Sequence, residues 1–265
     1  MIDLRLRFGT NKVPVLSNGE IENHVDALIA EYNPDLLVRP KALDVDDFTE
    51  YYLGLRLRYT YLSHKGFIWG RMVFHNAMIL VYNPDTGKAD EEPVEKNTVI
   101  VDNTLLSGKR DNAYRSTVMH ECAHWIYHGR YYSIDRCQYI NQRQPYTSCN
   151  MKNIIGRSVP GMLYTDYDWI EHQAKYFSAA ILMPRKAVLK IYQEPFVNQY
   201  IQENCRGREN DELVRLLAKT FHVSQESARI RLVSLGLSKK TKKQKDSSFN
   251  WFGNYEQETD FLTLR

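Results

Sequence analysis

The sequence predicts an α+β fold in which helices pack against a small, mostly antiparallel sheet. Apolar residues recur at helical spacing in residues 18–32, the pattern becomes strand-like in residues 55–102, and helical spacing returns at residue 111. With 265 residues, 43% of them hydrophobic and 25% charged, the chain can bury a full hydrophobic core. We therefore expect one compact unit with appendages.

Two helices are expected before the sheet. In residues 18–32 the apolar side chains share one face, and Asn18 stands at a position suited to a helix cap. A shorter helix is expected over residues 45–53. The strands that follow are bounded by Gly66, by an Asn-Pro-Asp turn and by a proline. They are expected at Leu55–Leu62, Phe67–Phe74, Met78–Tyr82 and Thr98–Asp102.

The second half of the chain is expected to be mainly helical. A broad apolar surface predicts a helix over residues 111–129, ending at a glycine, and a second strong helix is expected over residues 168–183. Residues 130–167 show no clear period, and we interpret this stretch as a lid or a substrate-groove loop. Further helices are expected at 185–204, 210–221 and 224–235.

These elements divide the chain into three expected parts. Residues 1–205 would form the main domain, residues 206–237 would add helix-turn-helix-like helices packed on it, and residues 238–265 would form a basic tail. The formal net charge is only +3, and much of the excess lies in the lysine-rich run from Lys239 to Lys245. We interpret this run as a solvated, flexible tail. Nucleic-acid binding through the run or the C-terminal helices is the weaker alternative.

Composition favours a soluble, cytoplasmic protein. Residues 1–11 lack the apolar stretch of a secretory signal, and no apolar run approaches the roughly 18 residues of a membrane helix. Without a signal, Cys122, Cys137, Cys149 and Cys205 indicate reduced thiols. The spacing of Cys137 and Cys149 is unlike that of a structural zinc site, so a second metal centre is not expected.

Residues 120–124 read His-Glu-Cys-Ala-His within the helix expected at 111–129. On a helix, His120 and His124 lie about 40° apart on one face, so both rings can reach one metal ion. Glu121 lies beside them, placed to take a proton from water rather than to bind the metal. The pattern predicts a zinc-dependent hydrolase. The alternative is two ordinary histidines that happen to lie one turn apart.

Catalytic zinc usually has three protein ligands, so a third must come from elsewhere in the chain. Glu171 is favoured because it stands in the first turn of the helix expected at 168–183, whose apolar residues form a packing face. Asp166 and Asp168 are better suited to capping that helix. The candidates downstream of the motif are Asp135, Asp166, Asp168, Glu171 and His172.

Other side chains near the motif have divided interpretations. His128 can touch a substrate or support a ligand, or be an ordinary surface histidine. His172 can donate to a developing oxyanion or simply face solvent beside Glu171. Cys122 points off the ligand face and is expected in the core. One phenol among several tyrosines can polarise a scissile carbonyl, and sequence alone does not single it out. These tyrosines are Tyr127, Tyr131, Tyr132, Tyr139, Tyr146, Tyr164 and Tyr167.

At these residues the chain resembles the ImmA/IrrE-type metallopeptidases, bacterial and phage proteins that cleave helix-turn-helix repressors. The resemblance rests on Arg115–His124, on Glu171–Pro184 and on Leu217–Gly236. The second segment, a glutamate leading an Ala- and Phe-containing helix that ends in Leu-Met-Pro, is the family's usual third-ligand helix. The resemblance therefore implies a zincin-like helical core and raises Glu171 above its acidic neighbours.

The chain departs from the family's pattern in two places. Four residues after the ligand glutamate the family commonly has Asn or Asp, whereas this chain has Lys175, so a supporting hydrogen bond is lost or replaced. His124 and Glu171 are also 47 positions apart, which makes the intervening loop long. These differences bear on full activity and on substrate choice.

We therefore expect a zinc endopeptidase with His120, His124 and Glu171 as ligands and Glu121 as base. By resemblance, its protein substrate is a helix-turn-helix transcriptional repressor of a mobile element or stress regulon. The alternative is a catalytically impaired, zinc-containing regulatory module that binds a repressor or DNA. The intact motif favours the enzyme, because a structural site needs no base and normally has four protein ligands. Lys175 favours the alternative.

Overall fold

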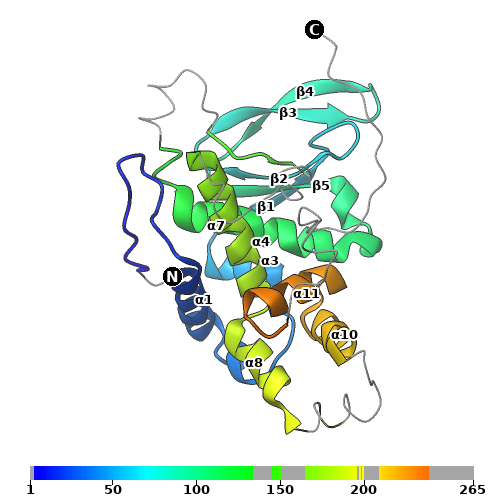
Figure 1. Ribbon diagram of the computed structural model, residues 1–265. Coiled ribbons are helices and arrows are strands. Elements are labelled where there is room, and N and C mark those ends of the chain that lie inside the picture. The colour runs from blue at the N-terminus through cyan, green and yellow to red at the C-terminus, as the bar shows by residue number, and fades with distance from the viewer. Residues whose placement is uncertain are drawn as a thin grey trace.

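The computed structural model describes residues 3–133, 145–150, 165–195, 197, 199 and 209–238. Over these residues the chain is a mixed α+β protein, as the sequence predicts. Figure 1 shows the hairpin of β3 (Ala77–Asn83) and β4 (Lys88–Val94) above a four-stranded sheet, with α4 (Asp111–His128) and the remaining helices below that sheet. The expectations for Asp135, Cys137, Tyr139, Tyr164, Cys205, Lys239–Lys245 and most of loop 130–167 fall outside the described residues.

The first predicted helix is confirmed in its bounds but not in its cap. α1 (Asn18–Tyr32) begins after Ser17, whose hydroxyl accepts a hydrogen bond from the Glu20 amide while the Glu20 carboxylate accepts one from the Ser17 amide. This capping box satisfies two amides at the helix start. Asn18, the expected cap, instead lies with Oδ1 3.1 Å from His172 Nε2. The fully buried face of the helix comprises Ile21, Val25, Leu28 and Ile29.

The helix expected over residues 45–53 forms in two parts. α3 (Val45–Asp47) passes directly into a π-helix, η1 (Phe48–Tyr52). The wider π turn spaces its hydrogen bonds one residue further apart than an α-helix does. A short helix that the sequence did not indicate, α2 (Asp35–Val38), lies between α1 and α3.

Four strands form the main sheet, in the order β1-β5-β2-β6. They are β1 (Arg56–Thr60), β2 (Ile68–Val73), β5 (Thr98–Asp102) and β6 (Cys149–Asn150). β5 runs parallel to β1 and antiparallel to β2, and β2 is antiparallel to β6. Every residue of β5 is buried, as expected for a central strand. The prediction of a mostly antiparallel sheet is confirmed, with one parallel pair at its edge.

The prediction of a single sheet without a strand at β4 is wrong. β3 and β4 pair along their whole length, from Ala77 with Val94 to Asn83 with Lys88, as a separate hairpin. β4 is charged and mostly exposed and contains a proline, features that weaken a strand pattern but suit an edge strand. A small apolar cluster holds the hairpin against the main sheet and comprises Leu62, Val73, Ile79, Val81, Val94 and Ile100.

α4 lies between the sheet and α7 (Asp166–Leu182), and it packs on both β2 and β5. As predicted, it ends just before Gly129. α7 begins at Asp166 rather than at residue 168, because Thr165 and Asp168 form a capping box at its start. The two helices that carry the motif and the expected third ligand therefore lie against each other in the interior.

The C-terminal helices share this core. They are α8 (Arg185–Gln193), α10 (Glu209–Phe221) and α11 (Gln225–Ser234). Leu217 and Leu232, on α10 and α11, are fully buried in the same apolar cluster as residues of α1, α4 and α7. His222 forms the turn between α10 and α11 with a φ of 52°. Among the described helices none is long and apolar enough to cross a lipid bilayer.

Candidate metal centre

Three buried side chains from two helices converge on one point. His120 and His124, one turn apart on α4, place their Nε2 atoms 3.0 Å from each other. Glu171, in the second turn of α7, lies with Oε2 3.4 Å from His120 Nε2 and Oε1 3.4 Å from His124 Nε2. The structure thus brings together the three residues that the sequence singled out as ligands.

This triangle has the dimensions of one face of a tetrahedral zinc site. Zinc bonds of about 2.0–2.1 Å to nitrogen and oxygen imply ligand atoms about 3.3 Å apart in a tetrahedron. The observed separations of 3.0, 3.4 and 3.4 Å lie close to that value. Glu171 Oε2 has no hydrogen-bond partner among the described residues, although it is buried. Because buried polar atoms are rarely left unsatisfied, these atoms fit a shared cation.

The Glu171 carboxylate is held in its charged form. Burial alone would raise its pKa, but the neighbouring His120 and His124 rings outweigh burial and hold the pKa well below its usual range. An ionised carboxylate between two imidazoles is the form that binds a metal ion.

The other candidates for the third ligand have different roles or lie outside the described residues. Asp168 takes part in the capping box at the start of α7, as expected, whereas Asp166, also expected as a cap, accepts a hydrogen bond from Asn11. His172 faces α1 and contacts Asn18 rather than the ligand triangle. The structure therefore does not bring His172 to a position for stabilising an oxyanion at this site.

A chain of hydrogen bonds fixes which nitrogen of His124 is free. Gln173 Nε2 donates to the Pro14 carbonyl at 2.8 Å, so Gln173 Oε1 faces His128 Nε2, 3.0 Å away. An amide oxygen only accepts, which assigns the single ring proton of His128 to Nε2. Burial, with the nearby His124, holds the pKa of His128 well below its usual range, and the ring is neutral.

The protonation of His124 follows from that of His128. His128 Nδ1 carries no proton, so it accepts from His124 Nδ1, which lies 3.0 Å away. A neutral His124 protonated at Nδ1 leaves the lone pair on Nε2, the atom in the ligand triangle. His128 is fully buried, so it is placed to support the His124 ring rather than to touch a substrate. The sequence did not single out Gln173, whose signal is its place two residues after Glu171 on the buried side of α7.

One carboxylate oxygen of Glu121 accepts a hydrogen bond, and the other does not. Thr147 accepts from the Met72 amide through Oγ1 and donates the proton of that hydroxyl to Glu121 Oε2 at 2.6 Å. Glu121 Oε1 is buried and has no hydrogen-bond partner among the described residues. Burial raises the pKa of Glu121 to about 7. A carboxyl with this pKa and one unoccupied oxygen is suited to exchanging a proton near neutral pH.

Gly70 of β2 allows the sheet to approach Glu121. A Cβ at this position would lie 2.6 Å from Thr117 and 3.0 Å from Glu121 Oε1, so a larger side chain cannot fit without moving one of them. Glycine inside a strand commonly marks such a close approach. Gly70 and Thr147 are therefore further site residues that sequence reasoning missed, and an isolated glycine in a strand was the available signal.

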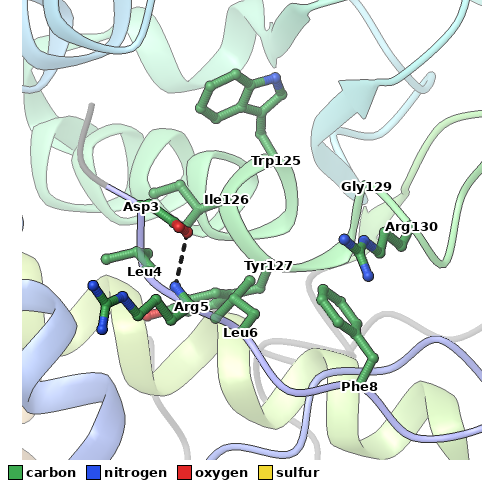
Figure 2. Close-up of a pocket in the computed structure, with 10 residues that line it drawn as sticks. All are labelled: Asp3, Leu4, Arg5, Leu6, Phe8, Trp125, Ile126, Tyr127, Gly129 and Arg130. Carbon is green, nitrogen blue, oxygen red and sulfur yellow. Dashed lines mark hydrogen bonds between the residues drawn. The ribbon is translucent and has the colours of Figure 1, made fainter.

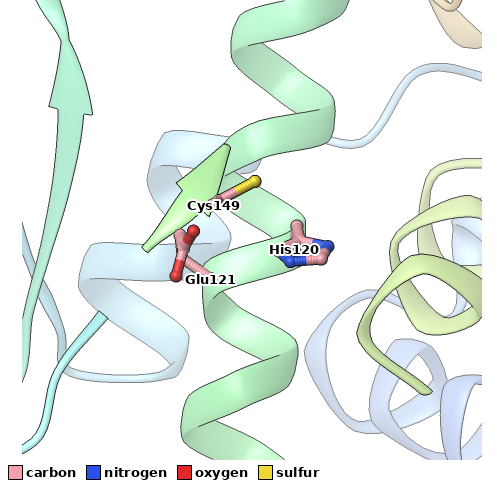
Figure 3. A group of neighbouring side chains, drawn as sticks. All are labelled: His120, Glu121 and Cys149. Carbon is pink, nitrogen blue, oxygen red and sulfur yellow. The ribbon is translucent and has the colours of Figure 1, made fainter. Parts of the chain in front are cut away.

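A cysteine that we did not expect at the site lies beside the base. Figure 3 shows Cys149 of β6 next to His120 and Glu121 of α4, and their candidate ligand atoms all lie within 4.8 Å of one another. Cys122, in contrast, is buried in the core with Sγ 3.3 Å from the Thr49 hydroxyl, as the sequence predicts. Buried His, Glu and Cys side chains at this site can thus hold a metal ion.

Two side chains of α7 add to the electrostatics of the site. Burial lowers the pKa of Lys175, and the Glu171 carboxylate opposes this shift. Tyr167 precedes Glu171 by one turn and is 41% exposed; burial and the Glu171 carboxylate raise the pKa of its phenol. Among the described tyrosines, Tyr167 thus combines nearness to Glu171 with access to solvent.

A cavity of about 650 Å³ lies elsewhere, between residues 3–8 and the end of α4 (Figure 2). Trp125, Ile126 and Tyr127 line one side of it, and the Arg130 guanidinium covers the Phe8 ring at 4.3 Å on another. None of its lining residues belongs to the cluster of His120, His124 and Glu171, so this cavity is distinct from the candidate metal centre.

Neither a scan against protein-family models nor a search of curated proteins finds a match for this chain. The family resemblance therefore depends on the motifs in the sequence.

Proposed function

We propose that this protein is a zinc-dependent endopeptidase in which His120, His124 and Glu171 hold the metal and Glu121 is the general base. The ligand triangle carries the proposal, because its three separations match a tetrahedral site. Two histidines and one carboxylate form a common catalytic zinc set with a fourth position left open.

The chain's own groups suit peptide hydrolysis. When bound, zinc would polarise the scissile carbonyl and lower the pKa of a water molecule. Glu121 Oε1 would take a proton from the attacking water while Thr147 holds Oε2 in place. Glu121 would then pass that proton to the leaving amine, and its pKa of about 7 suits both transfers. Tyr167 is the favoured phenol for polarising the carbonyl.

The position of α4 against the main sheet, with α7 across it, supports the zincin-like core that the ImmA/IrrE resemblance implies. The same resemblance supports a helix-turn-helix repressor as the protein substrate, and release of a mobile element or stress regulon from repression as the outcome. Cytoplasmic action follows, since such repressors are cytoplasmic.

One observation favours the second candidate function, a zinc-containing regulatory module. Cys149 lies with His120 and Glu121 in a second group of buried side chains whose candidate ligand atoms are within 4.8 Å of one another, and cysteine and histidine are the usual ligands of structural zinc. Direct DNA contact through α10 and α11 is less favoured, because both helices contribute apolar residues to the common core.

The test is co-expression with candidate helix-turn-helix repressors, including any encoded beside this gene. The wild type should cleave the repressor, and Glu121→Gln should not, while both bind about one zinc per chain. Glu171→Ala should lose the zinc. Glu91→Gln, which alters an exposed carboxylate on β4, is the matched control and should cleave normally. A wild type that binds the repressor without cleaving it would favour the module.

A further inference from the structure

The cavity between residues 3–8 and the end of α4 is large enough to hold a small organic molecule (Figure 2). Its volume of about 650 Å³ lies within the roughly 300–1,000 Å³ of typical ligand sites. Its walls come from two segments that are far apart in the sequence, so the cavity forms only when the chain folds. No residue of the candidate metal centre lines it.

Apolar side chains form most of the cavity walls. Those of residues 3–8 and Trp125 are only partly buried, so they leave apolar surface beside the cavity. An apolar ligand that enters would remove part of this surface from water, which favours binding. The apolar lining residues are Leu4, Leu6, Phe8, Trp125, Ile126 and Tyr127.

The charged groups of the lining give an excess of positive charge. Arg5 and Arg130 contribute two guanidinium groups, whereas Asp3 contributes the single carboxylate. Neither arginine has an ion pair with a carboxylate among the described residues. One oxygen of Asp3 accepts a hydrogen bond from the Arg5 backbone amide at 3.0 Å. Both guanidinium groups thus remain available to an anion.

Two local features hold the arginines at the cavity. The Arg130 guanidinium lies over the Phe8 ring, 4.3 Å from its centroid, which is a favourable position for a cation. Arg5 has a φ of 49°, in the left-handed region that residues other than glycine seldom adopt. Such strained backbone is common where a chain clamps a ligand.

We propose that this cavity binds a small organic anion, with an aromatic or other apolar body against the apolar walls and an acidic group paired with Arg5 and Arg130. A mainly apolar cavity with a few charged groups is typical of small-molecule sites. Binding is non-covalent and needs no metal, so this inference goes beyond the proposed peptidase and does not depend on it.

Both walls of the cavity continue into the hydrogen bonds behind His124. Phe8 pairs with Pro14, whose carbonyl accepts from Gln173, and Gln173 in turn accepts from His128. On the other wall, Tyr127 directly precedes His128. A ligand that orders residues 3–8 therefore also steadies the partner of Gln173 and, through it, the ring that supports His124.

Isothermal titration calorimetry on the full-length, metal-free protein tests the site, with naphthalene-2-sulfonate as the probe. We expect one probe molecule per chain and a dissociation constant below about 1 mM. Inorganic sulfate lacks the apolar body and naphthalen-2-ylmethylamine reverses the charge, so neither should bind detectably. Absence of sulfonate binding, or equally tight binding of the amine, would overturn the proposal.

Three arginine variants locate the bound anion. Arg5→Gln and Arg130→Gln should each weaken binding of the sulfonate about tenfold, because each removes a charged partner. Arg7→Gln is the matched control: Arg7 belongs to the same segment, but its guanidinium pairs with Glu20 and does not line the cavity. An equal loss in Arg7→Gln, or full affinity in both of the other variants, would contradict the site.

Zinc binding in competition with a chelator tests the connection to His124. Each of zinc and the sulfonate should bind about fivefold or more tightly when the other is present, since such coupling is reciprocal. This expectation rests on zinc binding at the candidate metal centre, whereas the calorimetry above does not. Unchanged zinc affinity with the sulfonate bound would overturn the connection and leave the ligand site intact.

Discussion

Two buried clusters of charged side chains in this protein differ in how completely their polar atoms are hydrogen-bonded. In the first, Arg231 of α11 donates to both carboxylate oxygens of Glu22 on α1 and to the Met183 carbonyl, and Tyr176 donates to Glu22 as well. Both charged side chains are nearly inaccessible to solvent. Every charged atom of this pair has a partner within the chain.

The second cluster is the candidate metal centre, where the carboxylates are equally buried but incompletely bonded. Glu121 Oε1 and Glu171 Oε2 lack hydrogen-bond partners among the described residues, and the lone pair on His124 Nε2 faces inward. Leaving buried polar atoms unsatisfied costs stability. The first cluster is therefore complete within the chain, whereas the second has the unsatisfied atoms that a bound cation would complete.

The largest expected effect on stability comes from breaking the ion pair of Glu22 and Arg231. Arg231→Met should lower the free energy of unfolding by about 3–5 kcal/mol, because it leaves the Glu22 carboxylate buried without a counterion. Urea unfolding monitored by circular dichroism measures this loss. Arg229→Met is the control: its ion pairs with Asp211 and Glu226 are partly exposed, so the loss should stay below about 1 kcal/mol. Similar losses in both variants would contradict the distinction.

Zinc should have the next largest effect on stability, and only through the candidate metal centre, whose buried carboxylates are incompletely bonded. A zinc concentration 100 times the dissociation constant should raise the free energy of unfolding of the wild type by about 2.7 kcal/mol, since the folded state alone binds it. Thermal or urea unfolding with and without zinc measures the increase. Glu171→Ala should show little increase, whereas Glu91→Gln should behave as wild type. Equal stabilisation of Glu171→Ala would show that zinc binds elsewhere.

The sequence predicted the parts of the fold that depend on local periodicity. α1, α4 and α7 have regular apolar faces, and their bounds were predicted to within about two residues, as is usual for such patterns. β4 was missed because its charged residues make it stable only as the partner of β3. The parallel pairing of β1 with β5 depends on the whole chain path, which local patterns do not encode.

In the candidate site, too, local sequence predicted some residues, whereas others depend on tertiary structure. His120, Glu121 and His124 lie within five residues, so helix geometry placed them, whereas Glu171 was singled out only with the help of the family resemblance. Thr147 and Cys149 reach the site because β6 pairs with β2, which depends on tertiary structure. The alternation of Thr147 and Cys149 opposite Gly70 becomes meaningful only once that pairing is known.

The hydrogen-bond chain behind His124 should have a smaller effect than removal of a ligand. Gln173→Leu removes the acceptor that fixes the His128 proton, so zinc affinity should fall about 10- to 100-fold. Competition with a chromophoric chelator measures the change. Gln173→Glu retains an acceptor and should recover part of the affinity. His172→Ala, on the same helix but facing Asn18, should leave the affinity unchanged. Equal losses of zinc affinity in Gln173→Leu and His172→Ala would contradict a role for the hydrogen bonds that run from Gln173 through His128 to His124.

The smallest expected effect is the acid dependence of the Glu22 and Arg231 cluster. Burial would raise the pKa of Glu22, but its bonds to Arg231 outweigh burial and lower the pKa below 4.5. A carboxyl with a depressed pKa stabilises the fold fully above its unfolded-state pKa, and this stability is lost as the pH falls through the folded-state value. The free energy of unfolding should therefore decrease with falling pH below about 4.5.

Measurements on metal-free protein separate the titration of Glu22 from the loss of bound zinc at low pH. Glu171 also has a lowered pKa, so the wild type should lose stability through both carboxylates. Glu22→Gln should be less stable at neutral pH but show a shallower decline between about pH 5 and pH 3, because one titrating group is gone. Urea unfolding across this range measures both slopes. Parallel slopes would show that Glu22 has the same pKa in both states, which would contradict the stabilising role of its bonds to Arg231.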